Sequence, residues 1–140
     1  MTRLVLAALA DIFVQQRFTS DCAVACLAMF LGVDYEEIVK HCTGYELTSN
    51  GLANSREAYI ARMFKIELEF LDRSKLNRKK PAVLTVPSLN SETGATHALY
   101  WNGKRIFDPN QGRQGKRTYT NQSAWEVAID GYQRATRGRP

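Results

Sequence analysis

The first half of the chain carries apolar residues with helical spacing, and the clearest such segment begins at Cys22. Before it, residues 19–21 are Thr-Ser-Asp, three side chains of the kind that caps a helix N-terminus. Every residue from Ala23 to Leu31 is apolar or small, and Gly32 can then end a helix in the left-handed conformation. Because this segment has no polar face, the pattern predicts a central helix that is buried on most sides.

Shorter helices are predicted from capping-box spacing, as between Asp34 and Glu37, and from apolar residues four positions apart, as Ile60 and Phe64. We expect one helix from Asp34 to about His41 and another over 55–64. A last short helix should begin after Ser123, which has capping-box spacing to Glu126, and should carry Trp125 and Ile129 on an apolar face.

The second half of the chain changes to a period of two, which is typical of strands. Apolar residues alternate with glutamates over 66–70, and residues 82–86 form a continuous apolar run that predicts a central strand. A short extended piece is expected at 12–16. Helices followed by an antiparallel sheet predict an α+β fold, with the helices on one side and the buried helix packed against the sheet.

Asn102 and Gly103 give the strongest hairpin signal. They lie between two segments with strand character, 97–101 and 104–107, and Asn-Gly suits the two-residue type I′ turn that joins twisted strands. We therefore expect an antiparallel hairpin, closed by a further turn at 108–110.

The chain has two histidines, and the hairpin register gives them different roles. With a two-residue turn, His97 lies directly opposite Asp108, with Cβ atoms ~5 Å apart. A carboxylate at that distance can hold an imidazole in one orientation and tautomer, as in a catalytic triad. His41 ends a predicted helix, where a cation suits the helix dipole, so a structural role is expected for it.

Cys22 stands where a reactive cysteine would be placed. The positive end of the helix dipole and the unpaired N–H groups of the first turn stabilise a thiolate there. Cys26 and Cys42 have no identified activator and are interpreted as small buried residues. Cys22 as nucleophile, with His97 as base and Asp108 as orienter, forms a candidate triad.

A zinc site is the main alternative use of the cysteines, built from Cys22, Cys26, His41 and Cys42. Its spacing, C-x3-C followed by adjacent His-Cys, matches none of the usual finger or ribbon patterns. We therefore expect no metal and no cofactor.

Length and composition narrow the class of protein. The 140 residues fit one domain over 1–140. Three cysteines are too few for a disulfide framework and favour a reducing compartment, so we expect a cytoplasmic protein. The apolar run at 4–10 is short for a signal peptide, and no stretch approaches the ~20 apolar residues of a membrane span, so no membrane insertion is expected.

The net charge of +5 comes from basic clusters at 73–80, 113–117 and 134–139. They fall in predicted loops or the tail and have no interleaved aromatic residues, which favours solvated loops over a nucleic-acid surface. No feature of the sequence indicates an oligomeric state.

The segment Gln16-Arg-Phe-Thr-Ser-Asp-Cys-Ala-Val-Ala-Cys-Leu-Ala-Met29, with His97-Ala-Leu-Tyr-Trp and Phe107-Asp-Pro-Asn, resembles the bacteriocin-processing double-glycine leader peptidases. The similarity runs over nearly the whole chain and includes a Gly-Leu-Ala segment at 51–53 before another helix. These enzymes are papain-like cysteine peptidases. The resemblance thus implies a papain-like fold, a peptide or protein substrate, and hydrolysis of a peptide bond through a thioester.

The resemblance also implies a role for Gln16, whose side-chain amide would form an oxyanion hole with the backbone N–H of Cys22. Gln15 is the neighbouring alternative. Ala23 stands where the family usually has glycine, and the best-known members are fused to an export transporter. Two other functions therefore remain open: a related thiol-dependent amidase or acyl transferase, and a catalytically silent binding or inhibitor module.

Overall fold

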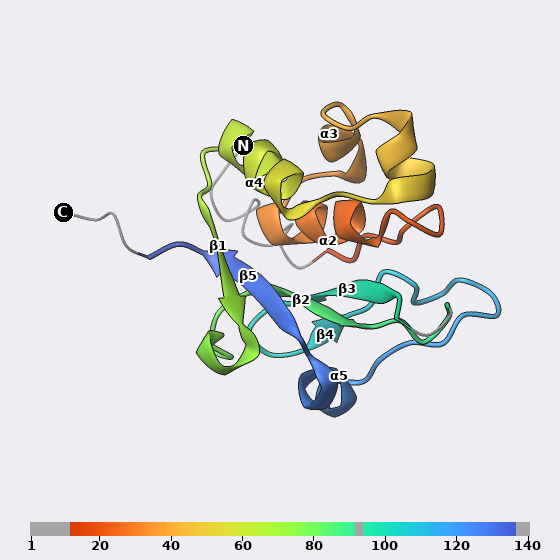
Figure 1. Ribbon diagram of the computed structural model, residues 1–140, viewed down its shortest axis with the longest axis vertical. Coiled ribbons are helices and arrows are strands. Elements are labelled where there is room, and N and C mark those ends of the chain that lie inside the picture. The colour runs from red at the N-terminus through yellow and green to blue at the C-terminus, as the bar shows by residue number, and fades with distance from the viewer. Residues whose placement is uncertain (1–11, 92–93, 137–140) are drawn as a thin grey trace.

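The structure is a computed structural model, which describes residues 12–91 and 94–136 (Figure 1). Among these residues, three helices form a layer on one face of a five-stranded antiparallel sheet, and a fourth helix lies against the opposite face. The predicted α+β fold with an antiparallel sheet is confirmed. The expectation that the helices gather on one side holds for the first three and is wrong for the last.

Helix α2 (Cys22–Leu31) is the predicted buried helix, with the predicted start and end. Gly32 adopts φ 71°, and its N–H points to the carbonyl oxygens of Ala28 and Met29, which is the left-handed cap that glycine favours. The side chains from 24 to 29 are all buried. The helix packs on the sheet through a core that includes Leu27, Met29, Ile38, Ile60, Val83, Tyr100 and Tyr132.

Helices α3 (Tyr35–Val39) and α4 (Asn54–Met63), with a π-helical turn η1 (Glu46–Asn50), complete this layer. Helix α4 begins and ends one residue before its predicted limits. Helix α3 is shorter than predicted, and the Asp34 side chain makes no capping hydrogen bond, so the expected capping box with Glu37 is not formed.

The sheet has the strand order β1-β5-β2-β3-β4. The predicted strand at 82–86 is confirmed as its middle member. The predicted extended piece at 12–16 is no strand, although Gln16 N–H donates to the carbonyl oxygen of Pro109 at 3.0 Å. The strands are β1 (Leu68–Asp72), β2 (Ala82–Pro87), β3 (Thr96–Trp101), β4 (Ile106–Phe107) and β5 (Asp130–Arg134), with a 3-10 turn η2 (Arg73–Lys75) after β1.

Strand β5 was not predicted, and it is inserted between β1 and β2. Gly131 permits this insertion, because a Cβ at that position would lie 2.4 Å from the carbonyl oxygen of Val83. The buried Gln133 side chain accepts from the N–H of Asn77 and donates to its carbonyl oxygen, both at 2.9 Å. Arg134, assigned to a basic tail from the sequence, ends this strand.

The β3–β4 hairpin has a different register from the predicted one. Trp101 pairs with Ile106, so four residues rather than two connect the strands, and the type I′ turn is wrong. The Asn102 side chain accepts hydrogen bonds from the N–H groups of Lys104 and Arg105 at 2.8 and 2.9 Å. An Asx-type turn, in which the asparagine side chain replaces a backbone acceptor, therefore shapes this loop.

Helix α5 (Asn121–Val127) begins earlier than predicted, because its capping box is not the expected one between Ser123 and Glu126. Thr120 and Ser123 form the box, each side chain accepting from the other residue's N–H. Trp125 is buried as predicted, whereas Ile129 is 49% exposed. The second core, beneath the sheet, includes Leu84, Val86, Leu99, Trp101, Ala124 and Trp125.

Within the described residues, no helix combines the length and the apolar content that crossing a bilayer requires. The apolar run at 4–10 lies outside these residues, as does the end of the last basic cluster.

Candidate functional site

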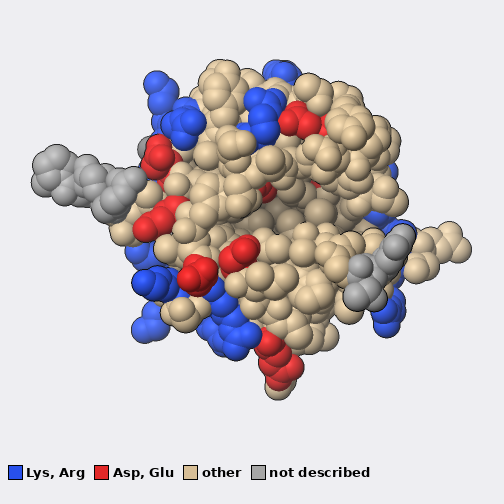
Figure 2. All heavy atoms as spheres, in the orientation of Figure 1, with Lys and Arg blue, Asp and Glu red and all other residues tan. Residues whose placement is uncertain are grey.

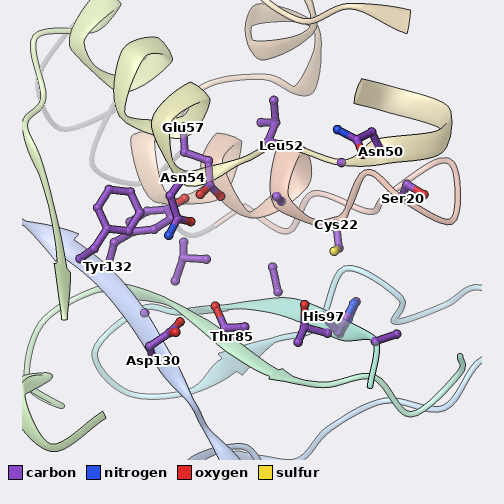
Figure 3. Close-up of a pocket in the computed structure, with 18 of the residues that line it drawn as sticks. Ser20, Cys22, Asn50, Leu52, Asn54, Glu57, Thr85, His97, Asp130 and Tyr132 are labelled. Atoms are coloured by element: carbon purple, nitrogen blue, oxygen red, sulfur yellow. The ribbon is translucent and has the colours of Figure 1, made fainter. Parts of the chain in front are cut away.

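A cleft of about 410 Å³ opens between the helical layer and the sheet, and the space-filling view shows the face hollowed there (Figure 2). Cys22 and His97 lie at one end of the cleft, and Glu57, Asp130 and Tyr132 lie at the other (Figure 3). The resulting groove has walls from both layers, as expected of a site that holds an extended ligand.

His97 and Asp108 are in direct contact, as the sequence predicted. His97 Nε2 lies 2.8 Å from Asp108 Oδ1, and the two side chains are 8% and 2% exposed. The carboxylate also accepts from the backbone N–H groups of Asn110 at 2.9 Å and Tyr119 at 3.0 Å. Three donors therefore fix its position.

This contact survives the wrong register because the error is an even number of residues. Extending the observed β3–β4 pairing puts Asp108 opposite Leu99, so His97 and Asp108 become diagonal neighbours on the same face. A shift of one residue would have placed them on opposite faces.

The imidazole of His97 favours the charged form. Burial acts to lower its pKa, but hydrogen bonds with Asp108 and Cys22, together with the charges of these groups, outweigh burial and raise the pKa from 6.5 to about 9. Because Nε2 faces Asp108, Nδ1 is the nitrogen left to face Cys22. Figure 3 shows the Cys22 sulfur pointing from α2 toward His97 on β3.

The other two thiols lie in environments that keep them neutral. Burial raises the pKa of Cys26 well above its ordinary value. Burial, followed by the charge of Glu46, raises the pKa of Cys42 to about 11. The surroundings of Cys26 and Cys42 therefore disfavour a thiolate at either position.

The zinc alternative finds no support. In residues 12–91 and 94–136 there is no group of three or more His, Cys, Asp or Glu side chains that could hold a metal ion. The His41 ring packs edge-on against Phe64, with ring centroids 5.9 Å apart. Cys42 Sγ donates to the carbonyl oxygen of Ile38 at 3.4 Å.

Asp21 has a different role from the predicted cap. Its fully buried carboxylate makes no capping hydrogen bond to α2. It accepts instead from the N–H groups of Arg17 and Phe18, at 2.8 and 2.9 Å, and from the Tyr35 hydroxyl at 2.6 Å. Asp21 therefore folds the loop between Gln16 and Cys22. The sequence marked Asp21 only as a candidate cap and as part of the segment 16–29 that carries the family resemblance.

Gln16 lies beside the Cys22 end of the cleft, in a small hollow that Cys22 and His97 also line. It is 2% exposed, and its amide donates to the Phe18 carbonyl oxygen at 2.7 Å, which leaves one amide hydrogen free. Gln15 is exposed and donates to the carbonyl oxygen of Gln111 at 2.9 Å. Of the two glutamines, Gln16 is therefore the one beside the thiol.

Sequence reasoning missed Glu57, which projects from α4 into the other end of the cleft (Figure 3). A single glutamate in an amphipathic helix reads as a solvent-facing residue, so no local signal marks it. Burial, followed by the charge of Asp130, raises its pKa from 4.5 to about 8.

Among solved structures, the chain is similar to a double glycine motif protease from an AMS/PCAT transporter, solved in complex with the leader peptide. The TM-score is 0.63 at 18% identity, over 89% of this chain and 91% of that chain. No family model matches the chain, and no curated protein matches it. The chain therefore has the fold of this protease, and the predicted papain-like arrangement, with the cysteine-bearing helix packed on an antiparallel sheet, is confirmed.

Proposed function

We propose that the chain is a cysteine peptidase that hydrolyses a peptide bond, with Cys22 as nucleophile, His97 as acid and base, and Asp108 as the residue that orients His97. The observation that carries this proposal is the buried His97, which is hydrogen-bonded to Asp108 and faces the Cys22 sulfur at the same end of the cleft (Figure 3). The similar protease was solved with a leader peptide, which supports a peptide as the ligand of this cleft. Three free cysteines suit a reducing compartment, so the proposed location is the cytoplasm.

In the acylation step, the Cys22 thiolate attacks the carbonyl carbon of the scissile bond and forms a tetrahedral oxyanion. The free amide hydrogen of Gln16 and the backbone N–H of Cys22 donate to that oxygen. The imidazolium of His97 then gives its proton to the leaving amine as the C–N bond breaks. This leaves a thioester on Cys22 and a neutral His97.

In the second step, neutral His97 takes a proton from water, and the hydroxide formed attacks the thioester carbon. The second oxyanion occupies the same position as the first. When it collapses, the C–S bond breaks, the peptide acid leaves, and Cys22 returns as a thiolate beside the imidazolium. The raised pKa of His97 favours this resting ion pair near neutral pH.

The test is alkylation of the native protein with iodoacetamide at about pH 6, where an ordinary thiol is almost wholly protonated. Cys22 should be modified first, as read by peptide mass spectrometry, because a neighbouring imidazolium stabilises its thiolate. His97→Ala should lose most of this advantage. The matched variant His41→Ala should keep it, since His41 packs against Phe64 away from the cleft.

Peptide-library cleavage by wild type, absent in Cys22→Ala, would then establish hydrolysis. Equal, slow labelling of all three thiols in wild type would refute the proposal and favour a silent binding module with this fold.

A further inference from the structure

The end of the cleft distant from Cys22 contains a buried carboxylate with no partner. Glu57 is 5% exposed, and within the described residues its carboxylate has neither a hydrogen bond nor an ion pair. Figure 3 shows the carboxylate pointing from α4 into the cleft. Burying such a group without a partner is costly, so its orientation toward open space indicates a ligand.

The sheet adds further negative charge at the same end. Asp130, at the start of β5, lines the cleft and raises the pKa of Glu57 through its charge. Asp72 is paired directly with Asp130 across β1 and β5. Like charges in opposite positions destabilise a sheet, yet neither aspartate has an ion-pair partner in the described part of the chain.

This lack of partners is unusual in a chain with 19 basic and 14 acidic residues. None of the described residues that line the cleft is Lys or Arg. In Figure 2, Lys and Arg lie around the edge of the face and not in the hollow. Among the described residues that line the cleft, none can therefore supply a positive charge to Glu57 and Asp130, whereas a cationic ligand could.

Two aromatic side chains shape the same end. Phe70 and Tyr132 both line the cleft, with ring centroids 5.4 Å apart, and Phe70 is partly exposed. The buried Tyr132 hydroxyl has no hydrogen-bond partner within the described residues. An apolar wall beside unpaired oxygen atoms suits a ligand side chain that has an aliphatic stem and a charged end.

We propose that this end of the cleft is a subsite for a lysine or arginine side chain of the peptide substrate. The stem lies against Phe70 and Tyr132, and the charged group is held by Glu57 and Asp130. The inference rests on the proposed function in that its occupant is a peptide lying in the cleft of Cys22. Binding of the cation favours ionised Glu57, so the proton that Glu57 holds in the empty cleft passes to solvent.

The experiment measures binding to Cys22→Ala protein, so that the result does not depend on turnover. The probes are N-acetylated pentapeptide amides of Gly and Ala with one Lys, placed at each position in turn. Each is matched by a peptide with norleucine, which has a similar stem and no charge. At one position, Lys should bind about tenfold or more tightly than norleucine, as expected of a charge-assisted contact in a partly buried site.

Glu57→Gln and Asp130→Asn, each added to Cys22→Ala, should reduce this preference to about threefold or less. Glu126→Gln is the matched control, because it removes the same charge from exposed α5 on the opposite face of the sheet and should leave the preference intact. No position with a Lys preference, or a preference that persists in both cleft variants, would overturn the proposal.

The iodoacetamide test separates the two proposals. A reactive Cys22 without a Lys preference refutes the subsite alone. A Lys preference with an unreactive Cys22 supports the subsite and refutes the peptidase.

Discussion

Asp108→Asn tests the link between structure and proposed mechanism most directly. The substitution keeps the size of the side chain but removes its charge and replaces one oxygen with an NH₂ group. All three partners of the carboxylate, His97 Nε2 and the N–H groups of Asn110 and Tyr119, can act as donors. The new NH₂ must face at least one of them, so one buried donor loses its acceptor, at a cost of about 1–3 kcal/mol in the free energy of unfolding.

The effect on His97 can be estimated from the same contacts. A pKa raised from 6.5 to about 9 corresponds to roughly 3 kcal/mol in favour of the imidazolium. Since burial opposes this, the contacts with Asp108 and Cys22 must supply all of it. A hydrogen bond to a charged group contributes about 1.5–3 kcal/mol, so the pKa of His97 should fall by about 1–2 units in Asp108→Asn. Turnover should fall by ~10⁴, the loss typical when the orienting aspartate of a triad is replaced by asparagine.

NMR titration of the imidazole protons measures this shift, because the chain has two histidines and His41 provides an internal reference. The pH dependence of stability gives a second measurement. The pKa of His97 is higher in the folded protein, so its stabilisation is complete below about pH 6.5 and is lost as pH rises through about 9. The stability difference between wild type and variant should therefore shrink over that interval. An unchanged His97 pKa together with full turnover would refute the assignment of Asp108.

Two further predictions concern the ends of the cleft. Gln16→Ala should lower the rate of cleavage by roughly 10²–10³ with a smaller effect on binding, as for loss of one oxyanion donor. Gln15→Ala should leave the rate of cleavage unchanged. The opposite pattern in steady-state kinetics would move the role to Gln15. Glu57→Gln should raise the free energy of unfolding by ~2 kcal/mol or more at about pH 8 and change it little near pH 4.5. The sign follows because folded Glu57, with its pKa raised to about 8, keeps a proton that the unfolded chain releases above 4.5, so wild type loses stability across that interval. Thermal melts at both pH values test this, and equal melting temperatures of wild type and variant at pH 8 would contradict it.

The sequence predicted the parts of the site that depend on local signals. The start of α2 was predicted from the polar residues 19–21 and the apolar run after them, so Cys22 could be placed at a helix N-terminus even though Asp21 makes no capping hydrogen bond. The pairing of His97 with Asp108 was predicted from a hairpin whose turn was assigned wrongly. It was correct because side chains on a strand repeat every two residues, and the error was two residues.

The missed parts depend on contacts distant in sequence. Strand β5 reads Asp-Gly-Tyr-Gln-Arg, with a glycine and three polar residues, and has no strand pattern. Its position depends on the close approach of Gly131 to Val83 and on the hydrogen bond between Gln133 and Asn77. The partners in each contact are far apart in the sequence, so no local pattern predicts them. The burial of Glu57 could not be predicted for the same reason, because β5 forms the wall opposite it.

The position of β5 also sets the order in which the molecule can assemble. Strand β1 pairs with β5 and with no other strand among the described residues, so its backbone groups stay unpaired until residues 130–134 arrive. A ribosome adds about 5–20 residues per second, and Cys22, His97 and Asp108 all emerge before this strand. A nascent chain can thus hold the proposed reactive groups while it still lacks one wall of the groove. The arrival of β5 would then determine when the groove is complete.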